Sequence, residues 1–526
     1  MQTVQQHSDD TVAKDKAPAA LTVHLHPDDN VAIAKTVLPE NTPLTQHGGI
    51  LVKSPIPAMH KLAIKAIAKG EQIRKYNQTI GIASTDILAG EHVHTHNCEL
   101  GEIEVRHAFC KDVTATEYVP LPQRATFQGY RRQHTQGVGT RNFIGVLTTV
   151  NCSATVAQQI ANTANQQLKT SGDYSNIDGV ASFVHTTGCG MKSNGDGYET
   201  FLRVLHGYIR HPNFGGLMLV GLGCEVMQIS RVLHEAGLKE SDLFRSFTIQ
   251  DQGGTRKAID AGLAIVREML PKVNLARRET VPASEIMIGL QCGGSDAFSG
   301  ITANPALGAA IDILVRHGGT GILSETPEIY GAEHLLTRRA VSPQVAEKLM
   351  ERLEWWKKYA QSTEELNNNP SPGNKAGGLT TILEKSLGAQ AKGGTTNMID
   401  VYKYGEPVTE RGFVFMDSPG YDPVSATGQI ASGANIVCFT TGRGSAFGCK
   451  PVPSIKLATN TRIFRHMHDD MDINCGGIMD GEYSVQESGA EIFKKVLSVA
   501  SGEKTKSEEL GYGDNEFNPW VIGATF

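Results

Sequence analysis

The stretch FIGVLTTVNCSATVAQQIANTANQQL, residues 143–168, decides the fold class of this chain. Its first ten residues form a nearly continuous apolar run, which is typical of a strand buried on both faces of a sheet. The next sixteen begin with Ser and carry apolar residues at helical spacing, so they predict a helix. A buried strand followed directly by a helix is the repeating unit of α/β proteins with parallel sheets.

The same unit recurs along the chain. Three further apolar runs close on glycine and cysteine, at residues 177–190, 215–225 and 285–296. Later strand candidates are GGTGILSETP, GFVFMDSPG and NIVCFTTGRG, and SPQVAEKLMERLEWWKKYAQST has the pattern of an amphipathic helix. We therefore expect a large α/β part with mainly parallel sheets.

The N-terminal part has a different sequence pattern. Residues 20–97 contain short β-type runs split by Gly, Pro and Asn, which predicts a small all-β domain. We interpret residues 1–19 as a flexible leader without a signal-peptide pattern, and 98–126 as a linker that runs over the surface. Residues 127–280 and 281–526 are then the first and second α/β domains.

The amino-acid composition favours some classes of function and excludes others. Glycine accounts for 56 of 526 residues, against a usual share of about 7%, without a Gly-x-y period, and aromatics are only 6%. This favours many tight turns around polar ligands. The formal net charge of −6 offers no basic surplus for nucleic acid, and no apolar stretch of about 18 residues predicts a membrane span. Nine cysteines in so long a chain favour a reducing, cytoplasmic setting over a disulfide framework.

Four cysteines occupy equivalent places in the pattern. Cys152, Cys189, Cys224 and Cys292 each follow a predicted strand at a turn of small residues. Because the carboxyl ends of parallel strands meet at one edge of a sheet, four thiols from four strands are expected to converge there. They predict either iron ligation, as a single ion or an iron–sulfur cluster, or cysteines that simply suit crowded strand ends.

A second set consists of histidines. In GEHVHTHN, His92, His94 and His96 alternate, so on a strand they share one face. His26 lies in HPDDNVA beside acidic residues. Neutral imidazoles with carboxylates suit Fe(II), Mn(II) or zinc, and the alternative is a solvated edge strand.

Three glycine-rich polar loops form the third set. They are QCGGSDAFSGITANP with Ser295 and Asp296, NPSPGNKAGG with Asn374 and Lys375, and TTGRGSAFG with Thr441 and Arg443. Such loops present backbone N–H groups and hydroxyls to an anion, and arginine offers a planar fork to a carboxylate. The alternative is that the glycines only permit tight turns. No GxGxxG, P-loop or GxSxG motif occurs.

These motifs resemble the altronate/galactarate dehydratase family of sugar-acid lyases. The resemblance runs from about residue 20 to the C-terminus and is carried by HPDDNVAIA, GEHVHTHN, GYRRQHTQGVGTRN, VGLGCE, LQCGGSDAFSGITANP, NPSPGNKAGG and FTTGRGSAFG. It implies a β-clip (SAF-like) domain before the α/β part, and loss of water from a hexonate or hexarate with a divalent metal, typically iron. GEHVHTHN, PEIYGAEHLL and NPSPGNKAGGLTT look more like the altronate branch, and LQCGGSDAFSGITANPA is shared with the galactarate branch. TTVNCSATVA and GMKSNGDGYE depart from the altronate pattern.

Our expectation is a dehydratase that converts D-altronate to 2-dehydro-3-deoxy-D-gluconate. Galactarate dehydration, a sulfolactate sulfo-lyase-like reaction, and a non-catalytic sugar-acid binding protein or sensor are the alternatives; a homo-oligomer is left open. The expected cofactor is Fe(II), with Mn(II) or an iron–sulfur cluster as alternatives. The site residues that we assign are Lys375, Asp296 and His94 for catalysis; Arg443, Ser295, Asn374 and Thr441 for substrate; and His26, His92, His94, Cys152, Cys189, Cys224 and Cys292 for metal.

Overall fold

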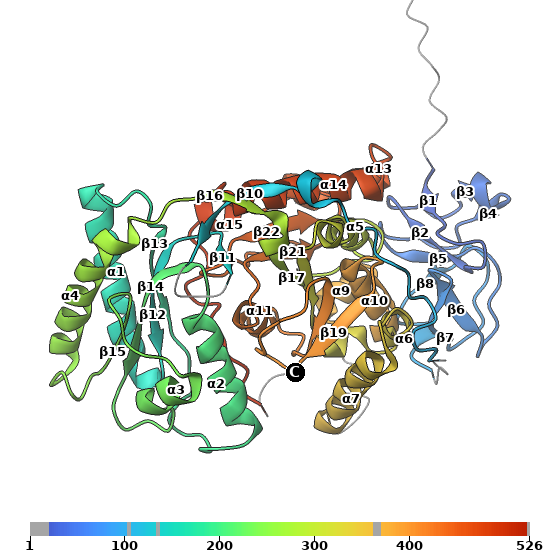
Figure 1. Cartoon of the computed structure of the whole chain (residues 1–526). Coiled ribbons are helices and arrows are strands. Elements are labelled where there is room, and N and C mark those ends of the chain that lie inside the picture. Colours follow the sequence, from blue (N-terminus) through green and yellow to red (C-terminus); the bar gives the residue numbers. More distant parts are fainter. Residues whose placement is uncertain (1–19, 102–106, 133–136, 361–369, 523–526) are drawn as a thin grey trace, which may run out of the picture.

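The computed structural model describes residues 20–101, 107–132, 137–360 and 370–522. The predicted leader, residues 1–19, lies outside the described residues. A small β module stands at one end of the molecule, a four-stranded sheet at the other, and a larger sheet between them (Figure 1). This confirms the predicted fold class, a small β domain followed by an α/β part with parallel sheets.

The N-terminal module consists of short antiparallel strands. Its first sheet has the order β1-β2-β5-β8 and its second the order β6-β7-β9, with a separate hairpin of β3 and β4. Their apolar side chains pack inside the module and against Ala332 and Leu387 of the C-terminal part. The strands are β1 Thr22–Val23, β2 Val31–Ala34, β3 Pro43–Leu44, β4 Ile50–Leu51, β5 Lys61–Ala63, β6 Gln72–Lys75, β7 Gln78–Ala83, β8 His92–Val93 and β9 Cys98–Glu99, with the 3-10 turn η1 Thr45–His47.

Residues 107–126 of the predicted linker run along the C-terminal part. The backbone amides of Cys110 and Val119 donate to carbonyls of Thr337 and Arg316, so the segment is fastened to that surface. It leads through η2 (Leu121–Gln123) into a small antiparallel sheet of order β11-β10-β16. That sheet comprises β10 Thr126–Arg131, β11 Val138–Gly139 and β16 Glu279–Pro282.

The stretch that opened the sequence analysis forms β12, η3 and α1. The sheet around β12 is parallel, in the order β13-β12-β14-β15. α1 and α4 cover one face, and α2 packs on the other. The elements are β12 Phe143–Thr148, η3 Asn151–Ser153, α1 Ala154–Ser171, β13 Gly179–Phe183, α2 Asp196–Ile209, β14 Phe214–Gly221, α3 Ile229–Ala236, β15 Phe244–Thr248 and α4 Thr255–Val273.

The C-terminal part contains a seven-stranded parallel sheet. Its order is β19-β20-β18-β17-β21-β22-β23, so the chain moves outward from β17 in both directions. The strands are β17 Met287–Cys292, β18 Thr320–Leu323, β19 Met398–Tyr402, β20 Phe413–Met416, β21 Ile436–Thr441, β22 Ser454–Ala458 and β23 Ile473–Asn474. Ligands bind where a parallel sheet reverses its strand order, which places the expected site beyond the ends of β17 and β21.

Helices surround this sheet. α5 and α14 pack on one side of the sheet within one core, while α11 packs with α2 of the smaller sheet in another. NPSPGNKAGG, expected as a loop, contains a short helix, α9, with Pro372 at its first position. The helices are α5 Ala303–Arg316, α6 Glu333–Thr337, α7 Pro343–Tyr359, α9 Pro372–Ala376, α10 Ile382–Ala389, α11 Asp422–Ala431, α12 Thr461–His466, α13 Gly477–Asp480, α14 Val485–Ala500 and α15 Lys506–Glu509, with 3-10 turns η4 Ala283–Glu285, η5 Thr326–Ile329 and η6 Gln390–Gly393. Among the described residues, no helix is long and apolar enough to cross a bilayer.

Two buried histidines each bridge two backbone segments: His185 within the four-stranded sheet, and His211 between that sheet and Ala434 of the C-terminal part. In each ring, Nε2 lies 3.0 Å from a backbone carbonyl and Nδ1 accepts from a backbone N–H at 3.2 Å. This arrangement needs the neutral imidazole, because a protonated Nδ1 no longer accepts. Burial lowers the pKa of each histidine to about 4.

We expect acid to destabilise the fold through these rings. Because their folded pKa is below the unfolded value of about 6.5, the stability they contribute is complete above pH 6.5 and is lost as the pH falls toward 4. Each contributes up to roughly 1.4 kcal/mol per pH unit in that window. In urea titrations, His211→Gln should flatten this dependence, and the exposed His468→Gln should leave it as in the wild type. An unchanged slope in His211→Gln would contradict the assignment.

Candidate functional site

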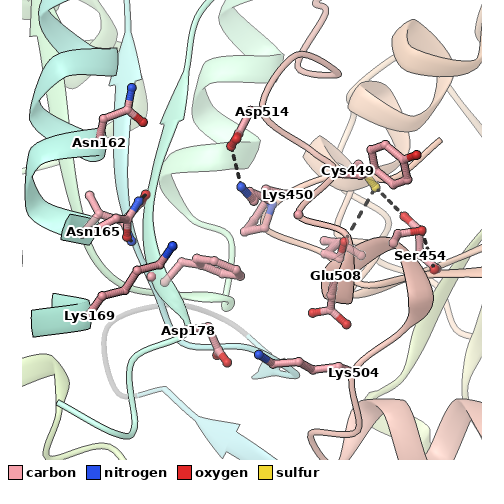
Figure 2. Close-up of a pocket in the computed structure, with 18 of the residues that line it drawn as sticks. Asn162, Asn165, Lys169, Asp178, Cys449, Lys450, Ser454, Lys504, Glu508 and Asp514 are labelled. Carbon is pink, nitrogen blue, oxygen red and sulfur yellow. Dashed lines mark hydrogen bonds and ion pairs between the residues drawn. The ribbon is translucent and has the colours of Figure 1, made fainter. Parts of the chain in front are cut away.

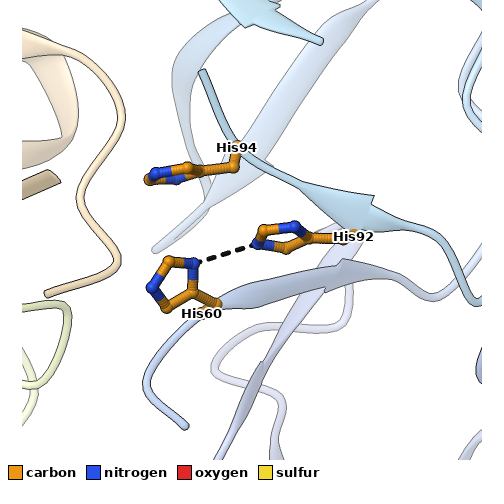
Figure 3. Close-up of side chains that lie close together, drawn as sticks. All are labelled: His60, His92 and His94. Atoms are coloured by element: carbon orange, nitrogen blue, oxygen red, sulfur yellow. Dashed lines mark hydrogen bonds between the residues drawn. The ribbon is translucent and has the colours of Figure 1, made fainter. Parts of the chain in front are cut away.

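Three histidine rings meet on the N-terminal module. His60 directly precedes β5, and His92 and His94 belong to the neighbouring strand β8 and the residue after it; β5 and β8 pair with Leu62 opposite His92. One ring nitrogen from each histidine lies within 4.8 Å of the others, and His60 Nδ1 is 3.0 Å from His92 Nε2. Figure 3 shows the three rings turned toward one another.

The electrostatics of this cluster favour neutral imidazoles. Burial, together with repulsion from His60 and the other rings, lowers the pKa of His92 to about 3. Burial and nearby Lys61 lower the pKa of His94 to about 4, and burial also lowers the pKa of His60. His94 Nδ1 is buried and has no hydrogen-bond partner among the described residues. Neutral imidazoles with an unused nitrogen are the form that binds divalent metals, so the cluster fits a metal ion.

The other predicted histidines lie apart from this set. His96 is exposed and only packs its ring against His92. His26 Nδ1 accepts from the backbone N–H of Asp28 at 3.1 Å in a turn before β2. The structure therefore brings together His92 and His94 but not His26, and adds His60, which the sequence analysis missed. Only the pairing of β5 with β8 identifies His60, because its sequence context, AMHKLA, carries no metal-binding spacing.

The three glycine-rich loops meet beyond the ends of β17 and β21. The Gly294 carbonyl accepts from the amides of Gly442 (3.0 Å) and Arg443 (2.8 Å). The amide of Ala297 donates to the Gly377 carbonyl at 2.9 Å, which brings in the loop that contains α9. Loops far apart in the sequence thus form one surface, as expected for neighbouring parallel strands.

Asp296 lies at the centre of these loops. It is 0% exposed and accepts from Thr459 Oγ1 (2.8 Å), Asn460 Nδ2 (3.0 Å) and Ser299 Oγ (3.1 Å). A Cβ at Gly442 would lie 2.2 Å from its carboxyl carbon, so this close approach requires glycine. Burial raises the pKa of Asp296. Its contacts are those of a group that orders the loops, and its assignment as a catalytic residue stays a prediction.

The remaining predicted residues of the loops line this junction. Lys375 is partly exposed on α9 and Arg443 is exposed after β21, while Ser295, Asn374 and Thr441 are buried. Thr441 Oγ1 accepts from the Gly444 amide at 3.1 Å and so shapes the loop around Arg443. Two cationic side chains therefore stand on neighbouring glycine-rich loops, and their charge suits an anionic ligand.

The histidine cluster and the loops form one constellation. His60 Nε2 lies 3.4 Å from the Ala376 carbonyl, and Lys61 Nζ donates to the Gly378 carbonyl at 2.6 Å. The imidazole of His60 thus contacts the α9 loop, next to Lys375. The histidine cluster therefore lies at the interface between the β module and the C-terminal part. It does not share a site with the four predicted cysteines.

A buried ion triad fixes this interface. Glu384 of α10 accepts from Lys61 Nζ (2.8 Å) and Lys75 Nζ (2.9 Å) of the β module, and all three side chains are 0–1% exposed. Thr380 donates to the same carboxylate from its amide (2.9 Å) and hydroxyl (2.8 Å). Burial by itself raises the pKa of a carboxyl, but the two ammonium groups offset this and hold the pKa of Glu384 well below its usual range.

The comparison with known proteins agrees with this geometry. Family models match in series: "Altronate/galactarate dehydratase SAF domain" over residues 20–101, "D-galactarate dehydratase/Altronate hydrolase, second domain" over 129–274, and "D-galactarate/Altronate dehydratase, C-terminal" over 283–525. The altronate dehydratase of Bacillus subtilis (strain 168) is 35% identical over 95% of this chain and 98% of the relative. The chain belongs to the altronate/galactarate dehydratase family.

Two further relatives define the breadth of this similarity. The galactarate dehydratase (L-threo-forming) of Escherichia coli (strain K12) is 38% identical over 96% of this chain and 98% of the relative. The (2R)-sulfolactate sulfo-lyase subunit beta of Chromohalobacter salexigens is 31% identical over 74% of this chain and 95% of the relative. Membership of the altronate/galactarate dehydratase family confirms the resemblance found in the motifs and the enzyme class, a sugar-acid hydro-lyase.

In this family member, Cys292 lies apart from the other three predicted thiols. It ends β17 of the seven-stranded sheet, where its Sγ is 2.9 Å from Lys392 Nζ, which also contacts Glu325 at 2.8 Å. Burial raises the pKa of Cys292 to about 12 and that of Glu325 to about 8. Cys152, Cys189 and Cys224 instead follow strands of the four-stranded sheet. The four thiols are therefore divided between two sheets, because the cysteine-ending strands do not form one continuous edge.

Cys292, Glu325 and Glu328 also lie within 4.8 Å of one another, as metal ligands do. The ammonium of Lys392 already contacts Cys292 and Glu325, and Lys385 pairs with Glu328. This cluster is therefore an internal ion-pair network at the edge of the loop that leads to Asp296. The sequence analysis did not find it, since its members come from separate strands and helices.

A cavity of about 550 Å³ shares no lining residue with the candidate site. It lies between α1 and segments near the C-terminus, with Lys169, Lys450 and Lys504 among its lining residues (Figure 2). Lys450 pairs with Asp514 there. None of the predicted site residues lines this cavity, so the candidate site is chosen by its chemistry and not by cavity size.

We expect Glu384→Gln to destabilise the chain by roughly 3–5 kcal/mol, because it leaves two buried ammonium groups without a counter-charge. The exposed Glu347→Gln on α7 is the matched control and should change stability by less than about 0.5 kcal/mol. Denaturant unfolding of the full chain measures both. Equal midpoints for Glu384→Gln and the wild type would show that the triad does not hold the interface.

Proposed function

We propose that this protein is a divalent-metal-dependent dehydratase of a six-carbon sugar acid, with D-altronate as substrate and 2-dehydro-3-deoxy-D-gluconate as product. The observation that carries the proposal is the junction itself. Three neutral imidazoles form a cluster, and one of them, His60, contacts the loop of Lys375, which is joined by backbone hydrogen bonds to the loop of Asp296 and through it to the loop of Arg443. The full-length similarity to an altronate dehydratase supports the choice of substrate.

Fe(II) is the proposed ion, with Mn(II) as the alternative, and His60, His92 and His94 are the proposed ligands. Imidazole suits these metals, and three protein ligands leave coordination positions for oxygen. The ion when bound supplies Lewis acidity toward the carboxylate or the leaving hydroxyl. Burial keeps these imidazoles unprotonated at neutral pH, so no other residue has to remove a proton from them before they bind the ion.

The protein's own residues account for the remaining requirements of the elimination. The C–H bond at C2 and the C–O bond at C3 break, a C2=C3 double bond forms, and the resulting enol becomes a 2-keto-3-deoxy acid with release of one water. Arg443 is proposed to bind the substrate carboxylate through its planar fork. Lys375, beside the Ala376 carbonyl that His60 approaches, is the proposed base, and a cluster histidine such as His94 is the alternative.

D-galactarate is the second candidate substrate. Its supporting observation is the 38% identity to a galactarate dehydratase over almost the whole chain. A hexarate carries two carboxylates, and the site offers two cationic side chains, Arg443 and Lys375. A sulfo-lyase reaction has weaker support, because the sulfo-lyase beta subunit is 31% identical to this chain, below the 35% and 38% of the two dehydratases. A binding or sensor protein would bind sugar acids without turnover.

The substrate proposal predicts 2-keto acid formation from D-altronate by the full chain with Fe(II) under reducing conditions. A chelator should abolish the reaction, and added Fe(II) should restore it. D-galactarate and (2R)-sulfolactate are assayed in parallel. Product from D-galactarate alone would show that galactarate, not altronate, is the substrate. Sulfite from sulfolactate would show a sulfo-lyase reaction. Binding of any of the three without product would indicate a sensor and contradict catalysis.

Site variants test the roles of individual residues. His94→Ala should lower kcat by about 100-fold or more and reduce bound Fe(II), because it removes one proposed ligand. The neighbouring exposed His96→Ala is its control and should stay within about twofold. Arg443→Gln should lower kcat/KM by about 10- to 100-fold through loss of a charge-assisted hydrogen bond, with the exposed Arg256→Gln on α4 as control. Full activity of His94→Ala would show that the histidine cluster takes no part in the reaction.

A further inference from the structure

Three exposed cysteines follow three adjacent strands of the four-stranded sheet. Cys152, Cys189 and Cys224 come after β12, β13 and β14, which are parallel neighbours in the order β13-β12-β14. Parallel strands bring the loops after them to the same edge of the sheet. Within the part of the chain that the structure describes, none of the three thiols has a hydrogen-bond partner.

Backbone hydrogen bonds join the three loops. The Asn151 amide donates to the Thr187 carbonyl at 3.0 Å, and the Gly188 carbonyl accepts from Val226 at 3.0 Å and Met227 at 3.1 Å. Each cysteine is therefore within two residues of a hydrogen bond to a neighbouring loop. Gly188 has φ +102°, and a Cβ there would lie 2.1 Å from the Thr149 carbonyl oxygen, so the loops approach as closely as their backbones allow.

A buried carboxylate makes this edge rigid. Glu225, directly after Cys224, is 3% exposed and accepts from Thr149 Oγ1 (2.8 Å) and from the amides of Leu222 (3.2 Å) and Gly223 (2.6 Å). Its hydrogen bonds connect the loop of Cys224 to the loop of Cys152. Thiols on loops fixed in this way lose little conformational freedom on binding a ligand, which favours a preformed site.

Helices α1, α2 and α3 begin after all three of these loops. The first of them, α1, begins two residues beyond Cys152. The amino-terminal ends of helices carry partial positive charge and lower the cost of an anionic sulfur nearby. Thiolate is the form that binds soft metals.

We propose that Cys152, Cys189 and Cys224 bind an iron–sulfur cluster, at a site separate from the histidine cluster. A single tetrahedral ion draws its thiolates to roughly 3.8 Å from one another, given metal–sulfur bonds of about 2.3 Å. Among the described residues, the ligand sets gathered within 4.8 Å are the histidine set and the Cys292 set, and the three exposed thiols are not one of them. A cluster bridges wider spacings, because each thiolate binds a different iron.

The site lies on a different sheet from the loops of Arg443 and Asp296, so the proposal does not rest on the proposed dehydratase mechanism. Three thiolates leave one iron of a four-iron cluster without a cysteine ligand. The solvent exposure of the three cysteines makes that position accessible to small molecules.

The test uses the full chain, purified without oxygen and supplied with Fe(III), sulfide and a thiol reductant, which reduces part of the Fe(III) and so gives the mixed Fe(II)/Fe(III) state of a cluster. After gel filtration we expect about four iron and four acid-labile sulfide per chain, with broad visible absorption. Single substitutions Cys152→Ser, Cys189→Ser and Cys224→Ser should each lower sulfide content at least twofold, and the triple variant should abolish it. Cys110→Ser, a partly exposed cysteine in the linker, is the matched control and should leave it unchanged.

Two results would overturn the proposal. One is iron and sulfide content in the triple variant equal to that of the wild type. The other is binding of one Zn(II) or Fe(II) per chain that needs the three cysteines but incorporates no sulfide, which would make this a single-ion site. Circular dichroism checks that each variant is folded. His94→Ala should retain the sulfide content, so failure of the dehydratase proposal is distinguishable from failure of this one.

Discussion

The site depends on one carboxylate buried between two lysines. Glu384 comes from the C-terminal part, while Lys61 and Lys75 come from the β module, and none of the three is stable in the interior without the others. The triad therefore requires the two parts to dock in one orientation. Lys61 also donates to the Gly378 carbonyl and directly follows His60. The same contact that pairs the charges thus positions the imidazoles beside the α9 loop.

The two parallel sheets present different chemistry at their edges. Beyond β17 and β21, glycine loops, hydroxyls and cations gather around Asp296, which suits a small, densely hydroxylated anion. Beyond β12, β13 and β14 the edge carries thiols and helix amino-termini. The glycine surplus in the composition has a concrete function in both places, because only glycine allows the close approaches at Gly442 and Gly188.

A buried ion-pair network lies between the core and the site. Burial raises the pKa of Glu325 to about 8, with Lys392 opposing this shift, and burial with the nearby Glu328 raises the pKa of Asp422 to about 7. The network includes Cys292, four residues before Asp296. Buried ion pairs therefore lie at the base of the loop that carries Asp296.

The sequence by itself determined the fold class, because a buried strand followed by a helix is a local pattern that parallel sheets repeat. It also determined the family and the polar loops, since motifs such as LQCGGSDAFSGITANP are continuous in the chain. Only the tertiary structure decided which groups meet. His60 joins His92 and His94 because β5 pairs with β8, and Cys292 is separated from the other thiols because β17 belongs to another sheet. Strand pairing and burial act between residues far apart in the chain, and local spacing does not encode them.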